Sequence, residues 1–286
     1  MTARASGSAP GAALAGLVAA PVVVGLGYSA AAAIGLAGPA ARGLSLVHID
    51  RVMRDATVWR GLAWTIYAAA LATALATAAA VAVAIGFRGT GIGDRLARIA
   101  ALVPFPIPYV VAAAGAVLVL GQSGLLARLA AAAGVIHDPS GFPPLVLDRP
   151  GLGFILTFAW KEVPFLTFVA VSVLATRGQQ LEETARTLGA SPAATLRRVT
   201  VPLLWRGLAP AVVLVFIFIA GTYEGAALLG PTDPLPFAVA TYERYQALDL
   251  TLRGDGFVLT LLGLILGLAA VAVFEWTRAR AERLRS

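Results

Sequence analysis

The chain has 286 residues, of which 59% are hydrophobic, and its mean hydropathy is +0.83. A soluble domain has an apolar share of about 45–50%, so no single core in a chain of this size buries the excess, and lipid must cover it. The absence of cysteine excludes disulfides, thiolate metal sites and thiolate chemistry, and the distribution of the net charge of +7 argues against a nucleic-acid partner.

The chain begins with a polar stretch and a first apolar run. Residues 1–10 are small and polar with one charge, at Arg4, and we expect them to be disordered. Residues 11–38 are long enough to cross a hydrocarbon core of ~30 Å, which needs about 20 helical residues. A cleaved signal peptide is the alternative, although this run is longer than the apolar region of most signal peptides.

Five more apolar runs have the length of membrane spans. Pro104, Pro106 and Pro108 make the start of the second of them irregular, so its regular helix is expected nearer Tyr109. We therefore predict an all-α integral membrane protein with six transmembrane helices in a membrane domain covering residues 11–286. The five runs are 63–87, 99–120, 152–175, 208–229 and 257–274.

The segment between the third and fourth spans, residues 121–151, is too long for a structureless connector in a compact protein. Helix-forming residues over 125–133 predict a short surface helix, and Gly141-Phe142-Pro143-Pro144 predicts an extended stretch after it. A plain connector is the alternative.

Two charged residues fall near the middle of the fourth span. Lys161 and Glu162 are about ten residues into it, hence ~14 Å deep at 1.5 Å per residue. Charges at that depth face protein or a water-filled pathway. Because adjacent helical residues point ~100° apart, we expect one of the two to line a pathway and the other to pair with a neighbouring helix, or both to be structural.

A polar segment follows, from Gln179 to Arg206. Good helix formers over 181–188 predict one short helix, which Gly189 closes in a left-handed conformation. Ser191 is a suitable N-cap and Pro192 a suitable first residue for a second short helix. Pro202 is expected to end or bend that helix before the next span. The segment therefore predicts two short helices that meet at a sharp corner.

The spacing within this segment matches a known motif. Glu183-Thr184-Ala185, then Gly189, then Val199-Thr200-Val201-Pro202 resembles the EAA loop of ABC-importer permeases, with Thr184, Val199 and Val201 as mild departures. In that family the loop is a coupling helix that docks on a cytoplasmic ATPase. The resemblance implies this role for Glu182, Glu183, Ala185, Leu188, Gly189, Ala190, Ser191, Pro192 and Pro202.

The resemblance covers about the last three-quarters of the chain and implies the permease subunit of a binding-protein-dependent ABC importer of type I. The run from Trp160 to Phe165 is similar to permeases of the polyamine, thiamine and ferric-ion branch. The implied partners are a cytoplasmic ABC ATPase dimer, which would hold ATP and Mg²⁺, a second permease subunit, with a heterodimer favoured, and an external substrate-binding protein. The implied substrate is a small solute such as a polyamine or a thiamine-like compound.

The fifth span contains Tyr223 and Glu224 near its outer end. Together with Lys161 and Glu162 they are our candidates for lining a pathway, and snorkelling of Glu224 to the interface is the alternative. Gly221 and Gly225 form a GxxxG pattern that permits close helix packing.

The arginines predict the orientation. With the N-terminus inside, the inner segments hold 13 arginines and the outer segments hold eight. This bias predicts a multi-pass protein of the bacterial inner membrane with both termini, and the Gln179–Arg206 segment, in the cytoplasm.

No enzyme site is expected. The chain lacks the Gly-Lys-Ser/Thr turn of a P-loop, and His48 and His137 have no second His or Cys at metal-ligand spacing. We therefore predict no cofactor and no metal in this chain. A secondary transporter or channel that works alone is the main alternative function, and a membrane scaffold without transport is the other.

Overall fold

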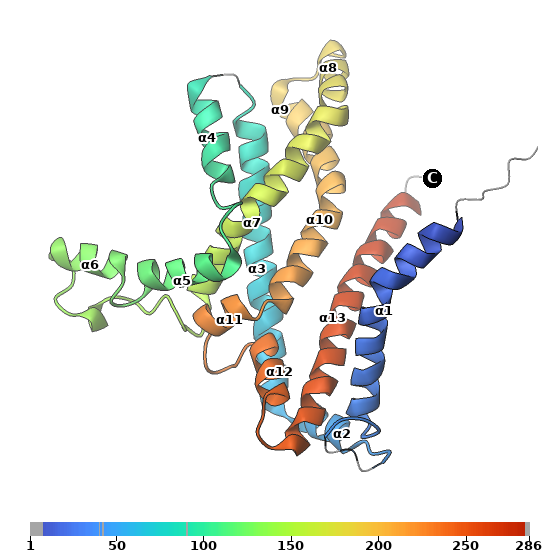
Figure 1. Cartoon of the computed structure of the whole chain (residues 1–286). Helices are drawn as coiled ribbons and strands as arrows, with labels where there is room; N and C mark the ends of the chain where they lie inside the picture. The colour runs from blue at the N-terminus through green and yellow to red at the C-terminus, as the bar shows by residue number, and fades with distance from the viewer. Residues whose placement is uncertain (1–7, 40, 42, 90, 284–286) are drawn as a thin grey trace, which may run out of the picture. The chain divides into compact units, whose positions relative to one another are not determined.

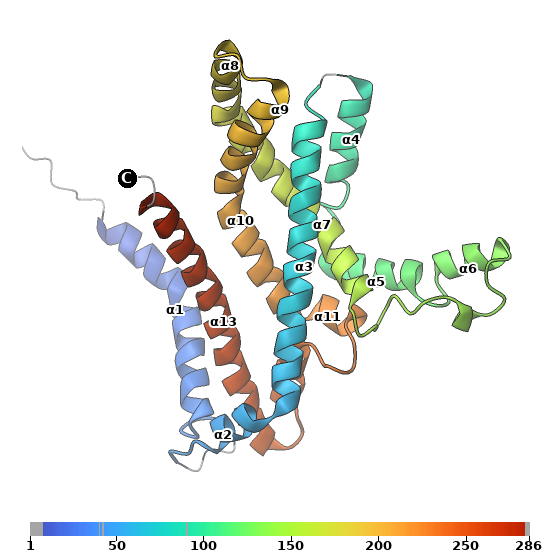
Figure 2. The same cartoon turned by 180° about the vertical axis from the view of Figure 1, so that it is seen from behind.

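The computed structural model describes residues 8–39, 41, 43–89 and 91–283 (Figures 1 and 2). All regular elements in these ranges are helical, which confirms the predicted all-α class. The α-helices are α1 (Ser8–Ala33), α2 (Val47–Arg54), α3 (Ala56–Gly86), α4 (Ile92–Leu102), α5 (Tyr109–Leu120), α6 (Leu125–Ala132), α7 (Leu152–Val173), α8 (Gln179–Thr187), α9 (Pro192–Thr195), α10 (Val201–Gly221), α11 (Glu224–Leu229), α12 (Phe237–Tyr245) and α13 (Leu250–Arg283).

Six helices in the described ranges are long and apolar enough to cross a membrane, as predicted. A 3₁₀ turn, η1 (Pro139–Gly141), and two π-helical turns, η2 (Leu174–Gly178) and η3 (Leu196–Thr200), complete the elements. The candidate spans are Ala13–Ala33, Ala56–Gly86, Tyr109–Ala132, Leu152–Thr176, Pro192–Gly221 and Leu250–Arg280.

Three predicted boundaries were wrong. α1 begins at Ser8, so residues 8–10 are helical, and residues 1–7 lie outside the described ranges. The span expected over 99–120 is divided into α4 and α5, because the prolines at 104, 106 and 108 lack the N–H groups that a helix needs. The span expected over 208–229 ends at Gly221, since Thr222 takes an extended conformation.

The chain divides into two compact units. The first consists of Met1–Val58 with Ala240–Leu266, and contains most of α1, α2 and the first half of α13. Tyr28 and Tyr245 both pack edge-on against Phe257 of α13, with ring centroids 5.4 and 5.5 Å away.

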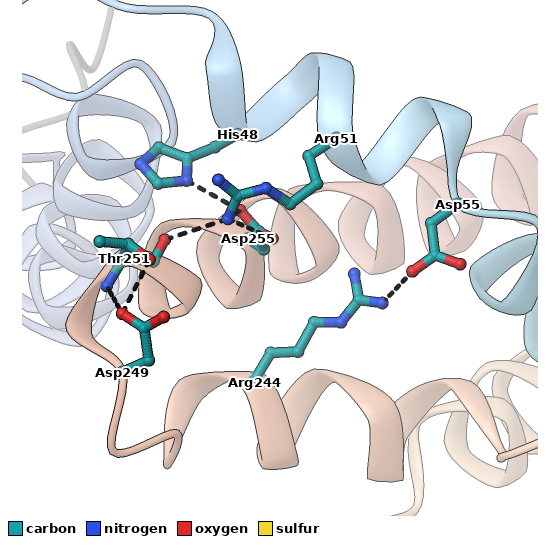
Figure 3. A network of polar contacts seen from close by, with 7 residues as sticks. All are labelled: His48, Arg51, Asp55, Arg244, Asp249, Thr251 and Asp255. Carbon is teal, nitrogen blue, oxygen red and sulfur yellow. Dashed lines mark hydrogen bonds and ion pairs between the residues drawn. The ribbon is translucent and has the colours of Figure 1, made fainter.

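A polar network joins the helices of this first unit (Figure 3). A hydrogen bond of 2.8 Å connects Nδ1 of His48 to the carboxylate of Asp255, which is 1% exposed, and Arg51 lies 3.2 Å from the same carboxylate. Arg244 of α12 donates to Asp55. The prediction that His48 is isolated was therefore wrong, because its partner follows more than 200 residues later.

The second unit consists of Trp59–Val239 with Gly267–Ser286. α7 packs against α5, α10 and α11, and its rings at Phe154 and Phe158 lie in the core. Gly225 of α11 lies directly against the Phe158 ring, where any side chain would collide. Because the chain bends between Gly221 and Gly225, these two glycines do not form the shared helical face that the GxxxG pattern predicted.

Candidate functional site

α8 and α9 form the predicted corner at one end of the second unit (Figure 1). Gly189 has a φ of +84°, and the N–H of Ala190 donates to the carbonyl of Ala185 over 3.0 Å, which closes α8 with a Schellman motif. The side chain of Ser191 accepts from the N–H of Ala194 and caps α9, with Pro192 in its first turn. The local signals in the sequence therefore predicted this corner correctly.

A buried carboxylate holds the base of the corner. Glu182 accepts from Nη1 of Arg88, which follows α3, with both of its oxygens at 2.9 and 3.0 Å. The hydroxyl of Thr200, in η3, donates to it over 2.6 Å. Burial alone would raise the pKa of Glu182, but the hydrogen bonds from Thr200 and Arg88 and the charge of Arg88 lower it below its ordinary value of 4.5.

Neither Arg88 nor Thr200 was singled out in the sequence. Arg88 precedes Glu182 by 94 residues, so only the folded chain brings them together. The signal that the sequence does offer is a pair of adjacent carboxylates, Glu182 and Glu183, of which one is buried and one exposed.

The other predicted coupling residues surround the corner. Leu188 is 83% exposed at the tip, although a leucine is normally buried. Ala185 and Ala190 are half-buried, and the remainder of the tip is exposed. The exposed residues are Glu183, Gly189, Ser191 and Pro192.

Pro202 lies elsewhere. α9, η3 and α10 form one continuous helix from Pro192 to Gly221, so the prediction that Pro202 ends or bends the second short helix was wrong. The wide turn η3, in which the N–H of Val201 donates to Leu196, shifts the hydrogen-bond ladder just before Pro202, where the missing N–H costs least.

A cavity of about 410 Å³ lies on the buried side of α7. Lys161 and Glu162, which are 6% and 3% exposed, both line it. The hydroxyl of Tyr109 donates to Glu162 over 2.7 Å, and the ammonium of Lys161 lies 4.3 Å from the centre of the Tyr109 ring. The same ammonium is 3.5 Å from the carbonyl oxygen of Phe105.

Two expectations about charged residues in the spans need correction. Lys161 and Glu162 do not separate into a pathway residue and a pairing residue, because Tyr109 stands between them and contacts both. Glu224 does not lie inside a span: it is exposed in the first turn of α11, after the break at Thr222. Tyr223 is half-buried at the start of α11, and neither it nor Glu224 lines the Lys161 cavity.

Among the described residues, no group of three or more His, Cys, Asp or Glu side chains is arranged to hold a metal ion. The charged groups described above are instead arranged as ion pairs and hydrogen bonds between helices.

Residues 76–285 match the family described as the binding-protein-dependent transport system inner membrane component. The chain belongs to this family. The match includes the corner, the Glu182–Arg88 ion pair and the Lys161 cavity.

Two curated relatives of this family illustrate the likeness. The inner membrane ABC transporter permease protein YnjC of Escherichia coli K12 is 27% identical over 255 residues, which cover 88% of this chain and 47% of the relative. The sulfate transport system permease protein CysW of Synechocystis is 30% identical over 169 residues, 57% of each chain. The chain thus spans about half the length of these curated relatives.

The fold is shared with a solved importer. A chain in the crystal structure of a bacterial ABC transporter involved in the import of the acidic polysaccharide alginate aligns with a TM-score of 0.72 at 16% identity. The alignment covers 95% of this chain and 93% of that one. The similarity confirms the predicted importer-permease architecture.

Proposed function

We propose that this chain is the permease subunit of an ATP-driven importer and forms half of an alternating-access pathway for a small solute. The exposed corner of α8 and α9 is the observation that carries the proposal. It presents Leu188 to solvent at its tip, and its base is fixed to the end of α3 by the Glu182–Arg88 ion pair. A force applied at the tip therefore reaches a membrane-spanning helix through a rigid contact.

The corner implies partners. A cytoplasmic ABC ATPase dimer would bind ATP and Mg²⁺ and receive the corner in a surface cleft, and an external binding protein would deliver the solute. One corner per chain suits one half of a two-fold pathway, so a second permease subunit is required, and the resemblance favours a different chain in that role.

The Lys161 cavity is the proposed contact site for the solute in this half of the pathway. Glu162 already accepts a hydrogen bond from Tyr109, whereas Lys161 has one long contact to a carbonyl oxygen and retains donors for a ligand. The proposed solute therefore carries an anionic or dipolar group. This refines the polyamine or thiamine-like substrate that the sequence favoured, because a purely cationic solute would meet the Lys161 ammonium.

Cross-linking tests the coupling role. Because the chain has no cysteine, Leu188→Cys introduces a single thiol at the tip, and Ser140→Cys introduces the matched control in the 121–151 segment. Each variant is produced with the ABC ATPases encoded by the same genome. We expect a cross-link to an ATPase from position 188 only, and ATP hydrolysis that rises with solute and binding protein.

Uptake into membrane vesicles distinguishes the alternative function. A secondary transporter or channel would move solute without ATP and without any cross-link from position 188, and that result would contradict the proposal.

A further inference from the structure

A second cavity, of about 460 Å³, lies where α3, α7 and α8 come together, beside the base of the corner. Its polar wall contains Arg88, Arg98 and Arg186 together with Glu182. Three guanidinium groups face one carboxylate, so the cavity has an excess of two positive charges.

The three arginines differ in how far they are already satisfied. Arg88 donates to the carbonyl of Ala84 and to Glu182. Arg98 uses only Nη1, which donates to the carbonyls of Phe87 and Gly89 at 2.6 and 3.0 Å. Within the described part of the chain, Nε and Nη2 of Arg98 and the whole guanidinium of Arg186 make no hydrogen bond. These donors are available to an anion.

The remaining walls are apolar and belong to the ends of two membrane spans. Val83 and Phe87 lie at the end of α3, and Val171 lies near the end of α7. Phe87 and Val171 are partly exposed, at 40% and 43%. A ligand that fills this cavity therefore meets charge on one side and hydrocarbon on the other.

α4, which carries Arg98, is suited to the membrane interface. Ile92, Leu96 and Ile99 recur at helical spacing and are all exposed, so α4 has an uncovered apolar stripe. Arg95 and Arg98 lie on the same helix. A basic amphipathic helix of this kind lies in the interface plane with its apolar face among the acyl chains.

We propose that this cavity binds the headgroup of an anionic phospholipid. Arg98 and Arg186 would donate to the phosphate, and the first acyl segments would lie along Phe87 and Val171. Basic pockets between membrane helices on the cytoplasmic side are suited to anionic headgroups. The proposal rests on the membrane placement given above but not on any contact between the corner and an ATPase, so the two can fail separately.

Native mass spectrometry of the purified full chain in a neutral detergent tests the site. Phosphatidylglycerol and phosphatidylcholine are titrated separately, and inorganic phosphate forms a third arm. We expect phosphatidylglycerol to bind at least about tenfold more tightly than phosphatidylcholine, and free phosphate to leave its binding unchanged. The combined change Arg98→Gln and Arg186→Gln should weaken phosphatidylglycerol binding by on the order of tenfold, because each basic residue near a membrane surface contributes about 1 kcal/mol.

Arg95→Gln is the matched control, since Arg95 is exposed on α4 and does not line the cavity. It should change the affinity by less than about twofold. An equal loss in this variant would indicate general surface attraction and overturn the proposal. Equal binding of the two lipids, or competition by free phosphate, would also overturn it.

Two further readouts keep the test decisive. Circular dichroism and thermal unfolding identify a misfolded glutamine variant, and in that case Arg98→Lys, which keeps the charge without the planar fork, should retain most of the binding. A second copy of the chain seated on the cavity would appear in the same spectra as a dimer without lipid. That outcome would replace the lipid with a protein partner and contradict the proposal.

Discussion

Two buried carboxylates in the second unit are stabilised in different ways. Glu162 accepts from the hydroxyl of Tyr109, whose ring also lies under the Lys161 ammonium. Glu182 accepts from a guanidinium and a hydroxyl, both supplied by other elements. The first arrangement lines a cavity, and the second fixes a surface corner to the end of a span.

Replacing Glu182 by glutamine tests the ion pair. The variant keeps the size of the side chain but leaves Arg88 without its carboxylate, and we expect a loss of about 1–3 kcal/mol, reduced toward the lower end because Arg88 is partly exposed. Thermal unfolding in detergent measures the loss. Glu183→Gln, at the exposed neighbouring position, is the control and should leave the melting temperature unchanged.

The same pair predicts a dependence on pH. Because the pKa of Glu182 is lower in the folded chain, its stabilisation is complete above its ordinary value of 4.5 and is lost as the pH falls through the lowered pKa. The difference in melting temperature between the natural chain and Glu182→Gln should therefore disappear on acidification below that value. A difference that persists in acid would show that the carboxylate charge is not responsible.

The Tyr109 hydroxyl can be removed without removing its ring. Tyr109→Phe retains the surface beneath Lys161 but takes away the donor to Glu162, which should cost about 1–3 kcal/mol for a buried charged acceptor. A double-mutant cycle with Glu162→Gln isolates the contact, and we expect a coupling of about 1 kcal/mol or more. Additive effects in the cycle would contradict the contact. Tyr67→Phe, at an exposed tyrosine of α3, controls for loss of a hydroxyl.

At the scale of elements, the corner combines an unusual backbone with an open surface. No atom lies within 4 Å of the position that a Cβ of Gly189 would occupy, although its φ of +84° is one that other residues rarely adopt. A substitution there strains the backbone without any internal collision. The strain and the steric effect on a partner can therefore be separated.

Three variants of Gly189 make this separation. Asparagine tolerates the left-handed conformation and should be mild, whereas alanine should destabilise the corner by about 1–2 kcal/mol. Arginine imposes a similar backbone strain and adds bulk, so it should reduce ATPase association more than alanine does at similar chain stability. Association is measured by co-purification, and equal association of the alanine and arginine variants would place the contact away from Gly189.

The elements that the sequence predicted best are those defined by local chemistry. The corner follows from Gly189, Ser191 and Pro192, and the predicted helix at 125–133 corresponds to α6. By contrast, hydropathy extended the fifth span through Thr222, because this residue interrupts the helix without interrupting the apolar run. The helices α2, α4 and α12 were not predicted, since short amphipathic helices give little signal against long apolar ones.

At the scale of the whole molecule, the partners of charged residues were beyond reach of the sequence. Arg88 and Glu182, and likewise His48 and Asp255, meet only after the spans between them have packed. Hydropathy and motif spacing were sufficient for the class, the number of spans and the family. They carry no information about which charges neutralise one another across the fold.

Orientation is the prediction that belongs to the whole chain. Ser140→Cys and Ala193→Cys place single thiols at exposed positions in the 121–151 segment and at the corner. A membrane-impermeant maleimide should label position 140 in intact cells and position 193 only after permeabilisation. The reverse pattern would put the corner outside the cell and exclude contact with a cytoplasmic ATPase.

The two wide turns that border the corner, η2 and η3, also determine which way it points. A π-helical turn accommodates one extra residue, so each arm of the corner can be regarded as a helix with a single insertion. Deleting one residue from Leu174–Gly178 would restore a regular helix and rotate everything beyond it by about 100°. Glu182 would then turn away from Arg88. The direction of the corner is thus a matter of helical phase, and a deletion of one residue would disturb it more than many substitutions.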